Sequence, residues 1–234
     1  MALAAHLKHP FSQAYALGCA AWLNSYRREP AAMSARAKET MGLSQAQALG
    51  WWLLWGMIFD GRGMADAGDP AAGIAQMESA LGMYRGVGSG MVVPYFLTQL
   101  AGAHTMNGDF DRAIERLDDA RGLVAQGGEA IAAAEIDRLD AEMRLQRAEL
   151  GGVPLGGSDL GAVELLLHRA IATSQQQGAR LFELRAATSL AKLLKSQGKT
   201  GAATAMLEAA INGIPDQMPT RDLDAARQAL LTVI

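Results

Sequence analysis

The chain has 234 residues, of which half are hydrophobic and only 6% are aromatic, and its formal net charge is −3. This charge excludes the strong positive field that nucleic-acid binding requires, and a single cysteine, Cys19, excludes an intramolecular disulfide. Many alanines and few aromatic residues favour closely packed helices over a sheet. We find no pattern of a secretory signal and no run of about eighteen apolar residues, so we expect a cytoplasmic protein.

A repeat of about forty residues organises the chain. Five similar segments start 40, 40, 50 and 40 residues apart; their eighth position is always apolar and their eleventh always small. Such self-similarity is typical of a solenoid, in which each unit buries its apolar face by stacking on its neighbours. The segments start at Pro30, Pro70, Phe110, Leu160 and Thr200.

Each unit is predicted to hold two helices. In the unit that starts at Pro70, apolar residues recur at steps of three and four from Ile74 to Tyr84, which indicates an amphipathic first helix. Gly88 then ends this helix, and a glycine near the end of most units closes the second one. The second helices are predicted over residues 49–62, 92–107, 130–149 and 180–197.

These elements predict one helical-repeat domain over residues 1–234. Because residues 11–28 align with a second helix, residues 1–8 are expected to be only the tail of a first helix, and the array is expected to begin within a unit. The one longer interval comes from the glycine-rich segment 151–159, a surface connection or alternatively a ligand-contacting loop. The expected parts are a partial unit 1–29, units 30–69, 70–109, 110–159 and 160–199, and a C-terminal unit 200–234 with a capping helix over 222–233.

Four segments of the chain are distinctive: HPFSQAYALGCAAWLNSYRREP, PYFLTQLAGAHTMNGD, AEIDRLDAE and FELRAATSLAKLLKSQGK. They resemble the tetratricopeptide-like C-terminal repeats of bacterial multidomain signalling proteins. In that family, a class III adenylate or guanylate cyclase or a transcriptional regulator is joined to a signal-transducing ATPase. The resemblance implies an all-α, right-handed superhelix of antiparallel helix pairs that serves as a sensor or scaffold. The period here exceeds the usual tetratricopeptide length of about 34 residues.

Aromatic residues give the first candidate binding site. All four tryptophans lie between residues 22 and 55, and a four-residue spacing places two of them on one helix face. The rings either fill the space between helices or line a groove for a peptide or an aromatic small molecule. If exposed, they would suit a dimer interface. The candidates are Trp22, Trp51, Trp52, Trp55 and Tyr95.

Charged residues on two predicted second helices give a further candidate. Glu135, Arg138 and Glu142 follow one another at three- and four-residue steps. Glu183 and Arg185 follow in the next unit. Their spacing allows ion pairs within a helix and across the stack. The alternative is that they hold a polar ligand in the inner groove.

No sequence motif indicates chemistry. The glycine-rich segment 86–90 follows a predicted helix instead of a strand, so it lacks the setting of a dinucleotide site. The histidines show no convergent ligand set, and we expect no catalytic residue, metal or cofactor.

The sequence therefore predicts a recognition module. It would bind a protein, a peptide or a small-molecule effector through its concave face, and a homodimer through the exposed terminal repeat is a further expectation. No nucleic-acid or membrane partner is expected. One alternative is a helical-repeat enzyme that uses the tryptophan-rich site with Glu135, Arg138 or His104. The other is a structural fragment without independent activity.

Overall fold

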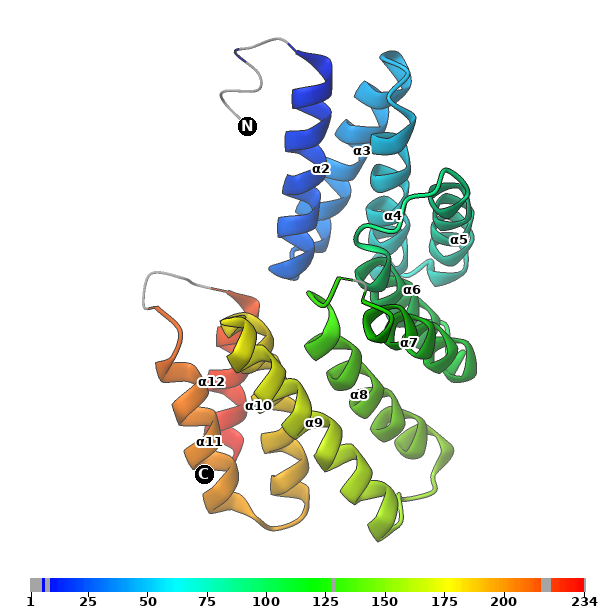
Figure 1. Ribbon diagram of the computed structural model, residues 1–234. Helices are drawn as coiled ribbons and strands as arrows, with labels where there is room; N and C mark the ends of the chain where they lie inside the picture. Colours follow the sequence, from blue (N-terminus) through cyan, green and yellow to red (C-terminus); the bar gives the residue numbers. More distant parts are fainter. Residues whose placement is uncertain (1–5, 7–8, 128, 216–219, 234) are drawn as a thin grey trace. The chain divides into compact units, whose positions relative to one another are not determined.

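The computed structural model describes residue 6 and residues 9–127, 129–215 and 220–233. These residues hold eleven α-helices and no strand, and the helices pack as sequential antiparallel pairs, which confirms the predicted all-α class. The predicted tail of a first helix, residues 1–8, lies outside the described residues except for His6. None of the described helices is long and apolar enough to cross a membrane. Figure 1 labels α2 (Pro10–Tyr26), α3 (Pro30–Ala46), α4 (Gly50–Asp66), α5 (Pro70–Gly86), α6 (Val93–Met106), α7 (Phe110–Ala125), α8 (Ala133–Gly151), α9 (Gly157–Gln177), α10 (Arg180–Ser196), α11 (Thr200–Asn212) and α12 (Arg221–Val233).

Proline and glycine set the helix boundaries. Proline occupies the first turn of α2, α3, α5 and α6, where the missing amide hydrogen is not needed. The chain reverses after α4, α6 and α10 at a glycine with positive φ. Gly68, after α4, has a φ of 101°. Arg28 takes the same place after α2, at a φ of 54°. Residues with positive φ thus recur at the forty-residue spacing of the sequence repeat, at Arg28, Gly68 and Gly108.

The chain divides into two compact units, which we describe separately. Unit 1 comprises Met1–Arg116 and unit 2 comprises Leu117–Ile234, so the division falls inside α7. The expectation of a single domain over residues 1–234 stays a prediction. In each unit the even-numbered helices touch one another: α4 contacts α2 and α6, and α10 contacts α8 and α12. They form a central row, and the odd-numbered helices α3, α5, α9 and α11 pack against it.

Burial follows this arrangement. More than half of the residues of α4, α6 and α10 are buried, because these helices have neighbours on several sides. In α9 and α11 only a narrow stripe is buried, which is the usual pattern of an amphipathic surface helix. The core of each unit therefore lies along its row of even-numbered helices.

Two glycines allow the backbones of α4 and α5 to touch. A β-carbon built on Gly73 would lie 2.2 Å from the carbonyl oxygen of Gly61, and one on Gly61 would lie 2.8 Å from the oxygen of Gly73. Both distances are shorter than any van der Waals contact. The crossing of α4 and α5 thus depends on two residues without a side chain.

Gly73→Ala is expected to destabilise unit 1, because the added methyl group meets backbone atoms that cannot move independently. The free energy of unfolding should fall by about 1–3 kcal/mol, the usual cost of overpacking. Gly82→Ala in the same helix is the control, since a β-carbon there meets nothing within 4 Å. That change should raise stability by up to about 1 kcal/mol through helix propensity. Urea denaturation measures both, and equal effects of the two substitutions would contradict the close approach.

Candidate functional site

The five aromatic candidates form one cluster in unit 1. The ring of Trp55 is the centre: its centroid lies 5.4 Å from Trp22, 5.1 Å from Trp51 and 5.3 Å from Trp52. Tyr95 joins through Trp22, at 5.9 Å. Trp52, Trp55 and Tyr95 are buried, whereas Trp22 and Trp51 are partly exposed. The structure thus brings these five residues together, with Trp52, Trp55 and Tyr95 inside the core of unit 1.

Hydrogen bonds tie the cluster to the turn between α5 and α6. The indole N–H of Trp55 donates to the Tyr84 hydroxyl at 3.3 Å, and this hydroxyl donates to the carbonyl oxygen of Met91 at 3.0 Å. Trp51 donates to the hydroxyl of Ser89 at 3.3 Å. These bonds hold the turn that leads into α6, where Val92 has a positive φ of 64°. The rings therefore pack the core and fix a turn.

The edge of the cluster is polar. The hydroxyl groups of Ser25 on α2 and Tyr95 on α6 lie 2.7 Å apart, and Ser25 also donates to the side-chain oxygen of Gln99 at 3.2 Å. Helices α2 and α6 thus meet through side chains, although α4 lies between them in sequence and contacts both. This bond closes one side of the aromatic cluster.

The charged candidates lie in unit 2, and Glu135, Arg138 and Arg185 form a buried chain of ion pairs. Arg138 bonds both oxygens of Glu135 at 2.8 Å within α8. Glu135 also lies 3.4 Å from Arg185 on α10, and Arg185 reaches Asp222 on α12 at 2.8 Å. Glu183 lies apart from this chain and pairs with Arg180 at 2.8 Å. The predicted pairing across the stack is therefore present between Glu135 and Arg185.

Burial and charge oppose each other in this chain of ion pairs. Burial alone lowers the pKa of Arg138, but the carboxylates of Glu135 and Glu142 outweigh it and raise the pKa above its usual value. The pKa of Arg185 is raised in the same way by Glu135 and Asp222. The carboxylates thus favour the charged form of both guanidinium groups. The pairs of Arg185 with Glu135 and Asp222 join α10 to α8 and α12.

Sequence reasoning predicted the pairing of Arg138 with Glu142 but missed Asp222. Glu142 lies 2.6 Å from Arg138 and accepts a 2.5 Å hydrogen bond from Ser189 on α10. The signal for Glu142 was its four-residue step from Arg138. Asp222 gave no such signal, because its partner is 37 residues away and depends on how α12 docks.

A second charged cluster in unit 2 lines a cavity of about 310 Å³ beside α7, α8 and α9. Asp137 bonds Arg169 at 2.9 Å, and Asp140 bonds Arg121 at 2.9 Å and Arg144 at 2.6 Å. Burial raises the pKa of the Asp137 carboxyl, and the two nearby arginines, Arg169 and Arg121, oppose this rise. The guanidinium groups pair with the carboxylates. The cavity wall combines the charged residues Arg121, Asp137 and Arg169 with apolar residues such as Val124 and Ile136.

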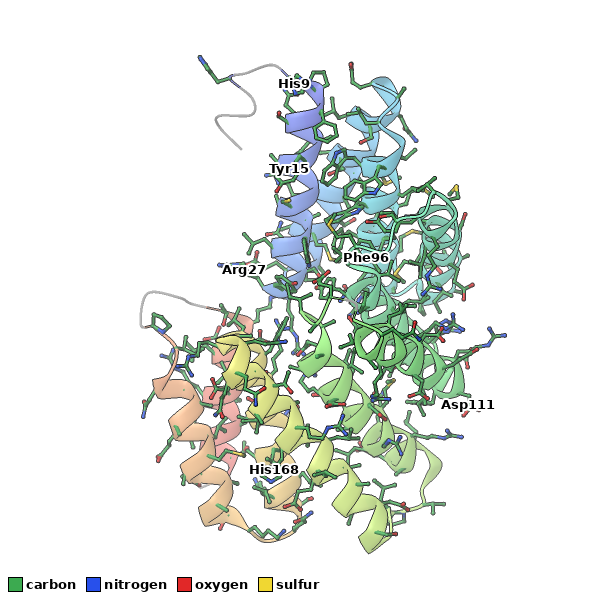
Figure 2. The ribbon with its side chains drawn as sticks, viewed as in Figure 1. His9, Tyr15, Arg27, Phe96, Asp111 and His168 are labelled. Carbon is green, nitrogen blue, oxygen red and sulfur yellow. The ribbon has the colours of Figure 1, made fainter. Side chains whose placement is uncertain are left out.

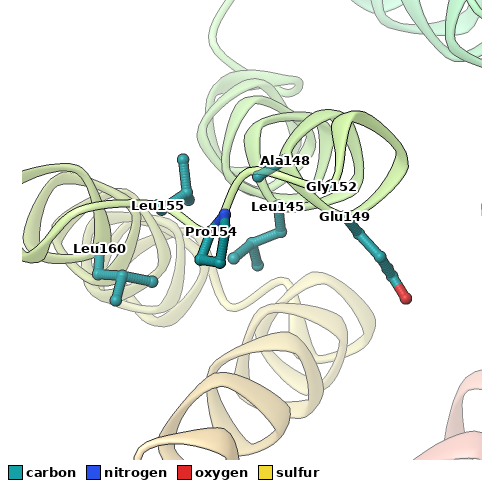
Figure 3. A pocket seen from close by; sticks show the side chains of 7 residues that line it. All are labelled: Leu145, Ala148, Glu149, Gly152, Pro154, Leu155 and Leu160. Carbon is teal, nitrogen blue, oxygen red and sulfur yellow. The ribbon is translucent and has the colours of Figure 1, made fainter.

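An apolar pocket lies where the glycine-rich segment joins α8 to α9. Its volume is about 360 Å³, and Glu149 is the one charged residue among those that line it. Figure 3 shows leucine and proline side chains facing one another, with the Glu149 side chain directed away. Leu150 and Val153 beside the pocket are both 70% exposed. The lining residues are Leu145, Ala148, Glu149, Gly152, Pro154, Leu155 and Leu160.

His104 is buried near the end of α6. Its Nε2 lies 3.7 Å from Glu78 and its Nδ1 lies 3.6 Å from Asp109. Neither ring nitrogen makes a hydrogen bond within the described part of the chain. Burial lowers the pKa of His104, and the carboxylates of Asp109 and Glu78 only partly offset this effect. Arg116 and Arg112 lower the pKa further. The residue is thus a packed histidine held between two acidic groups.

The fold is that of tetratricopeptide-like helical repeats, as a comparison with solved structures shows. No protein-family model and no curated protein matches it. Among solved structures, BtubC (BKLC) from P. vanneervenii covers 89% of this chain and 82% of its own, with 18% identity and a TM-score of 0.64. The nearly identical TPR-like repeats of a putative kinesin light chain from Podosopora anserina cover 74% of this chain and 81% of their own, with 14% identity and a TM-score of 0.52. This likeness shows the fold.

His104 predicts that acid destabilises unit 1. In the unfolded chain the histidine titrates near 6.5, but in the folded chain its pKa is lower. Between these values the unfolded state binds more protons, so the free energy of unfolding should fall as the pH drops through 6.5. His104→Gln should flatten this dependence in urea titrations at several pH values. His168→Gln, on the exposed surface of α9, is the control, and an unchanged pH dependence in His104→Gln would contradict the assignment.

Arg185→Met is expected to lower the free energy of unfolding of unit 2 by about 3–5 kcal/mol, because it removes the guanidinium that bonds two buried carboxylates. Arg180→Met in the same helix is the control, since Arg180 is 55% exposed and its ion pair contributes at most about 1 kcal/mol. Amide exchange gives a local readout. The amides of α12 should exchange faster in Arg185→Met than in Arg180→Met, and equal exchange would show that Asp222 does not hold α12.

Proposed function

We propose that the chain is a protein-interaction scaffold. The observation that carries this proposal is the stack of helix pairs, which matches a solved repeat protein over 89% of this chain. Stacked repeats generate long surfaces whose side chains vary from unit to unit, and proteins of this build use them to hold other proteins. The proposal is binding without catalysis. It is supported by Glu135, Arg138 and Arg185, because these charged candidates pair with one another inside unit 2.

We infer that the apolar pocket between α8 and α9 takes an apolar side chain of the partner. Its volume suits one large side chain, and its walls are leucine, proline and alanine. Leu150 and Val153 extend the apolar surface outward. Glu149 and the C-terminal end of α8 give the rim a negative potential. The matching partner segment has an apolar side chain next to lysine or arginine.

The resemblance to signalling proteins extends the proposal to a setting. We propose a sensor or scaffold part of a bacterial signalling system that works in the cytoplasm. Binding would act by changing the curvature of the stack, because each helix pair touches only its neighbours and small rotations accumulate. The support for this setting is the four sequence segments given above.

The test is cross-linking of the purified chain in a lysate of its source cells, followed by binding measurements with each captured protein. Wild type is expected to bind a defined protein, and Leu155→Ser should weaken that binding about tenfold, a loss of about 1.4 kcal/mol. Leu165→Ser is the control, because Leu165 is 60% exposed and does not line the pocket. Capture of no protein would overturn the scaffold proposal. Binding that Leu155→Ser leaves unchanged would overturn the pocket assignment alone.

A further inference from the structure

Helix α2 carries an exposed apolar stripe. Phe11, Tyr15, Cys19 and Leu23 follow one another at four-residue steps and therefore lie along one side of the helix. Phe11, Tyr15 and Leu23 are 51%, 54% and 57% exposed, and Cys19 is half-buried. We call these four residues the α2 stripe. Figure 2 labels Tyr15 on this helix.

Two positions of the stripe are buried in every later repeat. Tyr15 corresponds, at steps of 40, 40, 40 and 50 residues, to positions that are at most 6% exposed: Trp55, Tyr95, Glu135 and Arg185. Leu23 likewise corresponds to buried residues: Gly63, Ala103, Met143 and Leu193. The positions of Phe11 and Cys19 vary in their burial from repeat to repeat. Tyr15 and Leu23 thus lie where, elsewhere in the chain, a neighbouring helix covers the equivalent residues.

The cover that fits this stripe is a helix of the same kind. In unit 1 the even-numbered helix α4 is covered by α2, and in unit 2 α10 is covered by α8. A surface shaped for such packing has ridges of residues four apart, which interlock with the grooves of a similar helix. A second α2 offers the same ridge of aromatic, aliphatic and small side chains.

Charge favours a second copy of this chain over a charged peptide. The seventeen residues of α2 include no Asp, Glu, Lys or Arg, so nothing on the helix selects a charged partner or repels an identical helix. The other end of the array differs. Helix α12 exposes Arg221, Asp224, Arg227 and Gln228 beside one large apolar residue, Leu231, and such a mainly polar face suits solvent as a capping helix does. The exposed side of α12 therefore does not match the apolar α2 stripe in polarity, so head-to-tail stacking of two chains is disfavoured. The α2 stripe of a second chain does match it in polarity.

We infer that two copies of the chain pair through their α2 stripes into a closed dimer with two-fold symmetry. The contact is isologous, so the same residues act on both sides and the assembly ends at two. The packed aromatic and aliphatic side chains supply the driving force as they leave water. This inference goes beyond the proposed scaffold function and uses none of the residues of the apolar pocket.

The oligomeric state tests the inference. The chain has a mass of 24.7 kDa, and light scattering after gel filtration should give twice this value at micromolar concentrations. Tyr15→Lys/Leu23→Lys places like charges on both faces and should give a folded monomer, with folding checked by circular dichroism. Met83→Lys/Val87→Lys is the control, because both residues are exposed apolar side chains of unit 1 outside the stripe. The control should remain a dimer.

Three outcomes would overturn the inference. A wild-type monomer would do so, whether the stripe is then covered by residues 1–8 or by another protein. A dimer that persists in the folded Tyr15→Lys/Leu23→Lys variant would place the interface elsewhere. Growth into longer assemblies with rising concentration would show head-to-tail contact.

Cys19 offers a second readout, because it lies within the stripe and is the one cysteine of the chain. A short bifunctional maleimide should join two wild-type chains covalently. Burial raises the pKa of the Cys19 thiol, so the reaction is run at mildly alkaline pH. The product should be lost in Tyr15→Lys/Leu23→Lys. It should also be absent from Cys19→Ser/Met83→Cys, which moves the thiol away from the stripe, and a product of equal yield there would contradict the geometry.

Discussion

The structure depends on one constraint: a pair of helices from this chain cannot bury its apolar surface alone. Helices such as α4 and α10 bury more than half of their residues, so each needs neighbours before, after and beside it. Stacking supplies them, and the hydrophobic effect then acts along the row of even-numbered helices within each unit. The close crossing of Gly61 and Gly73 and the glycine turns are the backbone conditions that allow this stacking.

The two units meet this constraint with different chemistry at the same repeat position. Unit 1 places Trp55 and Tyr95 there, and the rings pack into a cluster whose polar atoms bond a neighbouring turn. Unit 2 places Glu135 and Arg185 there, and opposite charges join the helices. Aromatic packing tolerates small shifts, whereas an ion pair in the interior requires close alignment of two groups.

Much of the fold was predictable from the sequence, because its causes are local. The prolines at residues 30 and 70 and the glycines at residues 68, 108 and 198 mark helix boundaries through backbone geometry that does not depend on tertiary contacts. The site was less predictable. The sequence could place Trp55 and Arg185 in the central row, but it could not show how deeply their neighbours cover them. The ion pair of Asp222 could not be predicted from the sequence, because it forms only when α12 packs on α10.

An array of similar helices could also assemble one repeat out of place, with each apolar face covered by the wrong neighbour at little cost. The chain of ion pairs in unit 2 works against such slippage. Arg185 meets both Glu135 and Asp222 only in the native order of α8, α10 and α12. A shift by one repeat would leave a buried charge of this chain of ion pairs without its partner, against an aromatic ring or an aliphatic side chain. Such a loss costs about 3–5 kcal/mol. The buried ion pairs therefore specify the order in which α8, α10 and α12 pack in unit 2.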